Sequence, residues 1–345
     1  MSFSVLFRRR LAIMASLLVV TGLVACSTTA TPGSTGAGDG AETRTVTDWF
    51  GEVTIPVAPE RIVALDENAA LNLLMLGMKP QVTYNAWGSD VAVKILQEAG
   101  VEVRPMTGGG RRPAVEDVAN IEPDLIVVTA VAGSEQELAP FGDVAPTLRA
   151  PYMEPWRELV SAYGRYFDKG AASDKVIEVL TSMTKEVATK HADRPKSLSV
   201  LLGAVRGDSV MVTDSSNSLS TVIAESGFTR PAGEEKAAPE GQSYGGWVML
   251  SPEQIPQHDA DIVAVPKATY YDEKIVTRQP LFQALPAVKQ GRAPIVNGDM
   301  WTGGYGFAVY WVLVDLAAFA SGSIVVGTEA DAAQRWKQFQ SLITA

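Results

Sequence analysis

The chain has 345 residues, with 39 Asp and Glu against 29 Lys and Arg, and its formal net charge is −10 at pH 7. This acidic balance argues against nucleic acid as a partner and against a basic membrane-binding surface. A single cysteine excludes an internal disulfide.

The amino terminus has the three parts of a secretory signal in their usual order. Arginines at positions 8–10 precede an apolar run over 11–24, and Ala25 precedes Cys26. A spanning helix needs about 20 apolar residues, so this run is short for a membrane span. The residues at 23–26, Leu-Val-Ala-Cys, resemble a bacterial lipobox. We therefore predict a signal peptide over 1–25 and lipid attachment at Cys26; the alternative is an ordinary signal cut nearby, with Cys26 incidental.

The stretch that follows Cys26 is rich in Ser, Thr and Gly and has no apolar face. It predicts a lipidated flexible tether over 26–43 and places the folded part on the outer side of the membrane. The remaining 300 or so residues are enough for two hydrophobic cores rather than one.

Buried strands alternate with amphipathic helices in the first half of the folded part. Strands are expected at 61–65, 81–84 and 125–129, and helices at 67–77 and 90–99, each ended by a glycine. Such alternation indicates βαβ units and a mainly parallel sheet. We assign residues 44–152 to an N-terminal α/β lobe.

One long helix is predicted over 153–194, because this segment carries apolar residues at helical spacing and lacks proline from 156 to 190. Gly164 and Gly170 weaken the helical pattern, and a bend in the helix is expected near Gly170 if it bends at all. The alternation of strands and helices then resumes, which gives a C-terminal α/β lobe over 195–345. In that lobe strands are expected at 197–202, 209–213, 262–265 and 294–296, and helices at 219–225, 305–320 and 329–342.

The two halves contain similar segments. Superposing residues 115–128 on residues 252–265 pairs Glu116 with Glu253 and Asp124 with Asp261. This internal similarity predicts two lobes built alike. The helix dipole is a sufficient reason for either glutamate alone, but the pair suggests two carboxylates on one outer surface.

Enzyme motifs are missing from the sequence: there is no nucleophile elbow, no Walker loop and no Gly-x-Gly-x-x-Gly after a strand. The two histidines, His191 and His258, lie far apart and are expected to be structural or solvated. The protein is therefore predicted to be no enzyme, to hold no cofactor and to ligate no metal directly. A metal handled by it would arrive as a chelate.

Aromatic and arginine side chains follow the carboxyl ends of several predicted strands, where ligands bind in open α/β sheets. Packing explains any one aromatic residue, but the set favours a bulky, partly anionic ligand. The candidate ligand-binding residues are Tyr84, Trp87, Arg111, Arg112, Arg206, Tyr244, Trp247 and Trp301.

Four segments resemble the ABC-transporter substrate-binding proteins for ferric siderophores, heme and vitamin B12. They are PERIVALD at 59–66, LGMKP at 76–80, IEPDLIVV at 121–128 and DADIVAV at 259–265. The resemblance implies an α/β fold of two Rossmann-like lobes joined by a single long helix, with the ligand cleft between them. It also implies that Glu116 and Glu253 dock onto arginines of a membrane permease.

The resemblance favours a monomeric receptor, lipid-anchored on the extracytoplasmic face of the membrane, that captures a ferric siderophore and delivers it to an ABC permease. A heme receptor is the first alternative, with Tyr84, Tyr244 or Tyr270 as an axial ligand. A cobalamin receptor and a scaffold lipoprotein without transport function also stay open. The sequence names neither the siderophore nor the permease.

Overall fold

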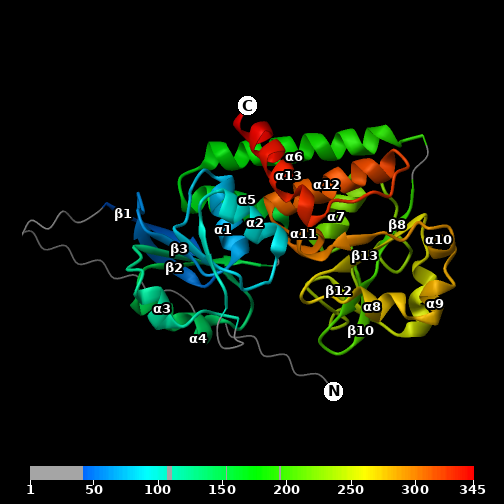
Figure 1. The fold of residues 1–345 in the computed structure, drawn as a ribbon, viewed down its shortest axis with the longest axis horizontal. Coiled ribbons are helices and arrows are strands. Elements are labelled where there is room, and N and C mark those ends of the chain that lie inside the picture. Colours follow the sequence, from blue (N-terminus) through cyan, green and yellow to red (C-terminus); the bar gives the residue numbers. More distant parts are fainter. Residues whose placement is uncertain (1–41, 107–110, 153, 194–195) are drawn as a thin grey trace, which may run out of the picture. The chain divides into compact units, whose positions relative to one another are not determined.

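The structure, a computed structural model, describes residues 42–106, 111–152, 154–193 and 196–345. The predicted signal peptide, Cys26 and most of the predicted tether lie outside the described residues. Residues 41–345 form one unit, in which two α/β lobes lie below the long helix α6 (Gly170–Lys190) in the view of Figure 1.

A five-stranded parallel sheet forms the N-terminal lobe, in the order β5-β4-β3-β6-β7. Its central strand β3 is at most 4% exposed, as expected for a strand covered on both faces. The three strands predicted from 61 to 129 are confirmed, and an antiparallel hairpin of β1 and β2 precedes them. The strands are β1 (Thr43–Asp48), β2 (Gly51–Pro56), β3 (Ile62–Ala64), β4 (Val82–Tyr84), β5 (Glu102–Arg104), β6 (Leu125–Ala130) and β7 (Thr147–Pro151).

Asp66 fixes the first helix of this lobe to the sheet. Its carboxylate accepts hydrogen bonds from the Ala69 backbone N–H at 2.9 Å and from the Thr129 hydroxyl and backbone N–H, both at 2.7 Å. One side chain therefore caps α1 and holds its start against β6. The helices are α1 (Glu67–Met75), α2 (Asp90–Glu98), α3 (Val115–Ala119), α4 (Glu135–Leu138) and the 3-10 helix η1 (Ala139–Asp143).

The segment predicted as one long helix over 153–194 contains two helices in the structure, α5 (Trp156–Tyr166) and α6. The break lies at Phe167–Lys169, where Asp168 has a φ of 52°. A left-handed residue cannot continue an α-helix. Because Gly164 lacks a side chain, Ser173 of α6 can approach α5; a Cβ at Gly164 would lie 2.1 Å from its Oγ. The prediction of one helix, bent near Gly170, was therefore wrong at 167–169, where the helix is interrupted rather than bent.

Two sheets, not one, make up the C-terminal lobe. Strands β14, β13 and β8 are parallel, whereas β11, β12, β10 and β9 form an antiparallel sheet. The expectation of a mainly parallel sheet thus holds for only part of this lobe. The strands are β8 (Leu198–Val200), β9 (Leu202–Ala204), β10 (Ser209–Thr213), β11 (Ser243–Tyr244), β12 (Trp247–Leu250), β13 (Ile262–Lys267) and β14 (Ile295–Asn297).

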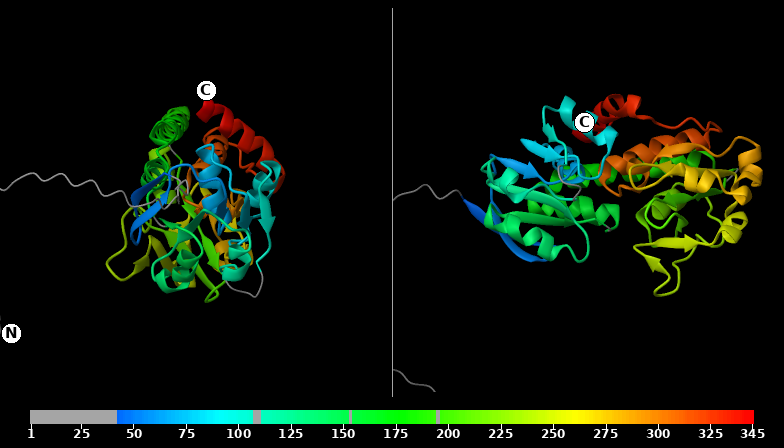
Figure 2. Two further views of the ribbon diagram at one scale, coloured as in Figure 1. Left: turned by 90° about the vertical axis from the view of Figure 1, so that its left-hand side faces the viewer. Right: turned by 60° about the horizontal axis from the view of Figure 1, so that its bottom comes forward.

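The last two long helices join the lobes. Helix α12 packs on α1, α5, α6 and α7, and α13 returns to pack on α2 of the N-terminal lobe (Figures 1 and 2). The remaining helices of the C-terminal half are α7 (Ser218–Glu225), η2 (Pro252–His258), α8 (Glu273–Thr277), α9 (Pro280–Gln283), α10 (Pro286–Lys289), α11 (Gly298–Thr302), α12 (Gly306–Ala320), η3 (Glu329–Asp331) and α13 (Ala332–Thr344). Among the described residues, no helix is long and apolar enough to cross a membrane.

One hydrophobic core runs through both lobes. It includes Leu71 of α1, Val176 of α6, Val200 of β8 and Phe307 of α12, each at most 1% exposed. Helix α12 approaches α1 so closely that a Cβ at Gly306 would lie 2.4 Å from the Met75 sulfur. Apolar packing therefore continues across the junction of the lobes.

The internal similarity has a structural counterpart. Asp124, before β6, accepts hydrogen bonds from the Glu60 and Arg61 backbone N–H groups, directly before β3. Asp261, before β13, accepts from the Ser197 backbone N–H, directly before β8. In both lobes the paired aspartate therefore joins the starts of two neighbouring parallel strands.

Candidate functional site

A cavity of about 680 Å³ lies between the lobes. Its N-terminal wall includes Asn68, Trp87, Arg111 and Tyr152, and its C-terminal wall includes Arg206, Tyr244, Trp247, Tyr270, Tyr271 and Asp299. Cavities of this size are typical of small-molecule sites.

Aromatic rings and one arginine meet where the two lobes face each other. Trp87 stacks on Tyr152 with ring centroids 5.0 Å apart, and its edge meets Tyr270 at 6.0 Å. The Arg111 guanidinium lies 5.7 Å from the centre of the Trp87 ring and 5.2 Å from that of Tyr270. These cation–π contacts hold an exposed positive charge at the cavity.

The Trp87 loop is held by a buried carboxyl group. Glu67, at the start of α1, is fully buried and accepts hydrogen bonds from the backbone N–H groups of Ala86, Trp87 and Ser89 at 2.8–3.1 Å. Burial raises its pKa to about 7. The loop that presents Trp87 is thus fixed from behind by a residue that does not line the cavity.

The antiparallel ribbon supplies the opposite wall. Tyr244 and Trp247 pair across the two-residue turn Gly245-Gly246, whose φ values of 57° and 79° are those of a tight hairpin. Tyr244 is 62% exposed and Met249 is 55% exposed. Arg206 follows β9 and is exposed as well. Exposed apolar side chains beside an exposed arginine are typical of a ligand-contacting surface.

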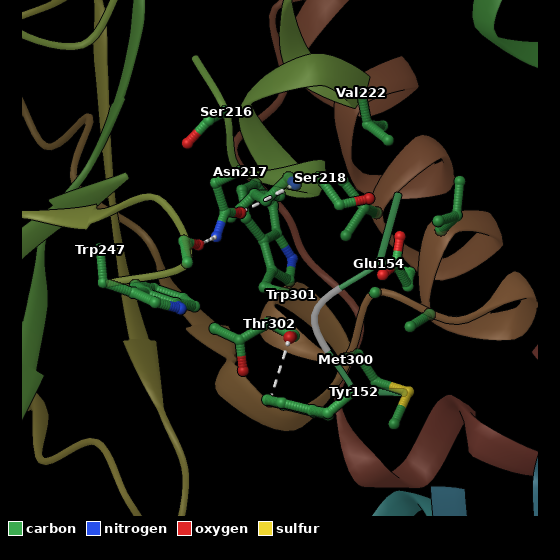
Figure 3. Close-up of a pocket in the computed structure, with 16 residues that line it drawn as sticks. Tyr152, Glu154, Ser216, Asn217, Ser218, Val222, Trp247, Met300, Trp301 and Thr302 are labelled. Atoms are coloured by element: carbon green, nitrogen blue, oxygen red, sulfur yellow. Dashed lines mark hydrogen bonds between the residues drawn. The ribbon is translucent and has the colours of Figure 1, made fainter. Parts of the chain in front are cut away.

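A smaller cavity of about 120 Å³ lies beside the large one. Tyr152, Trp247 and Thr302 line both cavities (Figure 3). Its other walls come from α7 and α12 and include Val222 and Val309. Asn217 Nδ2 donates to the Gly245 carbonyl oxygen at 3.1 Å, which fixes the hairpin turn at its mouth.

The model of the family described as "Periplasmic binding protein" matches residues 62–294. The chain belongs to the periplasmic binding protein family. This is a family of binding proteins and not of enzymes, as the missing catalytic motifs indicated.

Two curated relatives and one solved structure show the range of this similarity. The chain is 27% identical to the "Probable siderophore-binding lipoprotein YfiY" of Bacillus subtilis over 292 residues, covering 81% of this chain and 88% of the relative. It is 26% identical to the "Iron(3+)-hydroxamate-binding protein FhuD" of the same organism over 294 residues, covering 80% and 86%. It also resembles the structure of Staphylococcus aureus SirA complexed with staphyloferrin B, with a TM-score of 0.64, 18% identity and coverage of 81% and 99%. The two-lobed α/β fold expected from the sequence is thereby confirmed.

Five of the eight candidate ligand-binding residues line the large cavity of this periplasmic binding protein. They are Trp87, Arg111, Arg206, Tyr244 and Trp247. They come from four separate loops or strand ends of the two lobes, and the fold brings them together.

The other three candidates lie elsewhere. Tyr84, the last residue of β4, is 3% exposed and packs in an apolar cluster of the N-terminal lobe. Arg112 turns inward, where it donates to the Thr129 carbonyl oxygen at 3.0 Å and lies 3.7 Å from the Asp66 carboxylate. Trp301 is 1% exposed, donates to Asp315 at 2.9 Å and contributes to the smaller cavity only. Each has structural contacts that the sequence pattern does not reveal, and none of the three lines the large cavity.

The sequence interpretation missed Tyr152 and Asp299, which line the large cavity. Tyr152 directly follows β7 and Asp299 closely follows β14, so both obey the rule used for the other candidates. Tyr270 and Tyr271 also line the cavity, although neither was among the eight candidates.

Glu116 and Glu253 both lie on the surface, away from the large cavity. Each is exposed and stands in the first turn of its helix, α3 or η2. Neither forms an ion pair within the described residues. Their carboxylates are therefore available to a partner.

Both histidines are buried. The His191 ring lies 2.9 Å from the Val187 carbonyl oxygen, and the His258 ring lies 2.8 Å from the Glu234 carboxylate. Within the described residues, no group of three or more His, Cys, Asp and Glu side chains could hold a metal ion.

Proposed function

We propose that the protein is an extracytoplasmic receptor that captures a ferric siderophore between its lobes and delivers it to an ABC permease. The observation that carries this proposal is the composition of the large cavity, where exposed Arg111 and Arg206 stand beside the rings of Trp87, Tyr244 and Trp247. Arginine suits the anionic oxygens of a chelate, and flat rings suit its apolar outer surface.

The size of the cavity and the names of the relatives support the same function. A volume of about 680 Å³ suits a chelate of drug-like size or larger. YfiY is named as a siderophore-binding lipoprotein and FhuD as an iron(3+)-hydroxamate-binding protein. Heme would need an axial ligand. Tyr84 is too deeply buried to serve, whereas Tyr244 and Tyr270 line the cavity, so a heme receptor remains the alternative.

Tryptophan fluorescence tests this function. Ferric siderophores are expected to quench the emission in a saturable way, because Trp87 and Trp247 line the cavity. The measurement is a titration with ferric siderophores, heme and cobalamin in parallel. Replacing both tryptophans by Phe should remove most of the quenching, whereas Trp49→Phe in the turn between β1 and β2 should leave it unchanged.

Saturable quenching by heme alone would make the protein a heme receptor. Quenching by cobalamin alone would point to vitamin B12 uptake. A flat response to all three would favour the scaffold lipoprotein.

We further propose that Cys26 carries the lipid that tethers the receptor to the membrane. With Cys26→Ala no acyl chain can be attached, so the protein should move from the membrane fraction to the soluble fraction. Labelling with radioactive palmitate and cell fractionation measure both effects. Membrane retention of an unlabelled Cys26→Ala protein would show that another element anchors it.

A further inference from the structure

Side chains of both charges line the large cavity. Arg111 and Arg206 are exposed, whereas Asp299 is half-buried in the first turn of α11. Asp299 lines the same cavity. An anionic chelate explains the arginines but not a carboxylate that faces the same space.

Asp299 has no cationic partner in the part of the chain that the structure describes. None of the ion pairs there involves it, although they join lysines, arginines and one histidine to carboxylates elsewhere. A carboxylate withdrawn from water without a counter-charge is unfavourable. Its pKa is raised to about 7, first by burial and then by the charges of Glu67 and Asp90. A cation supplied by the ligand would relieve this cost.

Aromatic side chains line the same cavity as Asp299. Among them are Tyr152 and Tyr271. The Asp299 charge contributes to raising the pKa of Tyr271 to about 12 and to raising that of Tyr152. A cavity that offers both a carboxylate and aromatic rings is a favourable environment for an ammonium group, because ring faces attract a cation as well.

Asn68 provides an independent observation. It is only 8% exposed and lines the cavity. Its amide atoms are not among the sealed-off polar atoms of the described residues, so they remain open to the cavity. An amide in this position can bond a polar ligand group, and its oxygen can accept from an ammonium N–H.

We propose that Asp299 and Asn68 form a subsite for a protonated amine, so that the receptor prefers ferric chelates that carry a free amino group. The chelate's anionic oxygens then lie toward Arg111 and Arg206, and its ammonium group lies toward Asp299. This inference rests on the proposed function and narrows it to a class of chelates.

Matched pairs of ligands test the subsite. The probes are ferrioxamine B, which has a terminal primary amine, its N-acetylated form, and further ferric chelates with and without a free amine. Affinities are measured by fluorescence quenching at pH 8, where Asp299 is ionised. Acetylation should weaken binding to the native protein roughly ten- to a hundred-fold, the usual range for a hydrogen bond to a charged group.

Three variants assign the effect to the subsite. Asp299→Asn, which is nearly isosteric, should remove the preference for the amine and leave binding of acetylated chelates unchanged. Asn68→Ala should reduce the preference in part. Asp90→Asn is the matched control, because it removes a nearby negative charge that does not line the cavity.

The outcomes separate the subsite from the proposed function. Equal weakening of both members of a pair by Asp299→Asn, or the same loss in Asp90→Asn, would overturn the subsite while ferric chelate binding stands. Binding of amine-free chelates alone would also overturn it. If no ferric chelate binds at all, the proposed function fails and the subsite fails with it.

Discussion

Replacing both Glu116 and Glu253 by Lys is expected to abolish uptake of the ferric chelate while leaving its affinity for the receptor unchanged. Both carboxylates are exposed and lie outside the cavity. The family resemblance assigns them to arginines of the permease. At such a docking surface the substitution would turn two attractions into two repulsions, and like charges across an interface cost several kcal/mol.

Uptake of radioactive iron by cells that carry each variant measures transport, and fluorescence titration of the purified protein measures affinity. Asp174→Lys with Glu178→Lys on α6 is the matched control, since it makes the same change of charge at two other exposed carboxylates. Undiminished uptake by the Glu116/Glu253 variant would disprove the docking role. An equal loss in the control would point to overall charge.

The second large effect concerns stability. Glu234 is fully buried and holds three groups together: it pairs with Arg230, accepts from the Ser199 hydroxyl at 2.6 Å and lies 2.8 Å from the His258 ring. Glu234→Leu should lower the free energy of unfolding by about 3–5 kcal/mol, because it leaves the buried Arg230 charge without its counter-charge. Chemical denaturation followed by circular dichroism measures the loss.

A double variant distinguishes charge from packing. Burial already lowers the pKa of Arg230, so removing this charge together with Glu234 should restore much of the lost stability. Arg230→Met/Glu234→Leu should therefore be more stable than Glu234→Leu alone. If the double variant is the less stable of the two, the ion pair is not the main source of the effect.

Periodicity was sufficient for β3, β4 and β6 and for α1 and α2, because these strands are short apolar runs and both helices end next to a glycine. It did not reveal β7 or the hairpin of β1 and β2. It failed at Asp168, where one left-handed residue divides a segment of otherwise uniform helical pattern. It located β10 but not the antiparallel pairing of β9 to β12, since an antiparallel ribbon and a parallel strand have the same local pattern when both are partly buried.

Part of the site was predictable from one rule, which is that side chains directly after the carboxyl end of a strand point toward the ligand cleft. Trp87 and Arg206, chosen by this rule, line the large cavity. The rule failed for Arg112 and Trp301, whose partners Asp66 and Asp315 turn them inward. Asp299 obeys the same rule but was missed, because an anionic ligand gave no reason to look for a carboxylate.

The core shared by the two lobes bears on how the permease would distinguish full from empty receptors. Parting the lobes would expose the packing of α12 on α1, at about 25 cal/mol for each Å² of apolar surface. Because such opening is unfavourable, we expect Glu116 and Glu253 to keep the same spacing with and without cargo. Empty receptors would then compete with loaded ones for the permease. Uptake should depend on the fraction of receptors that is loaded, and overproducing the receptor when iron is scarce should slow transport.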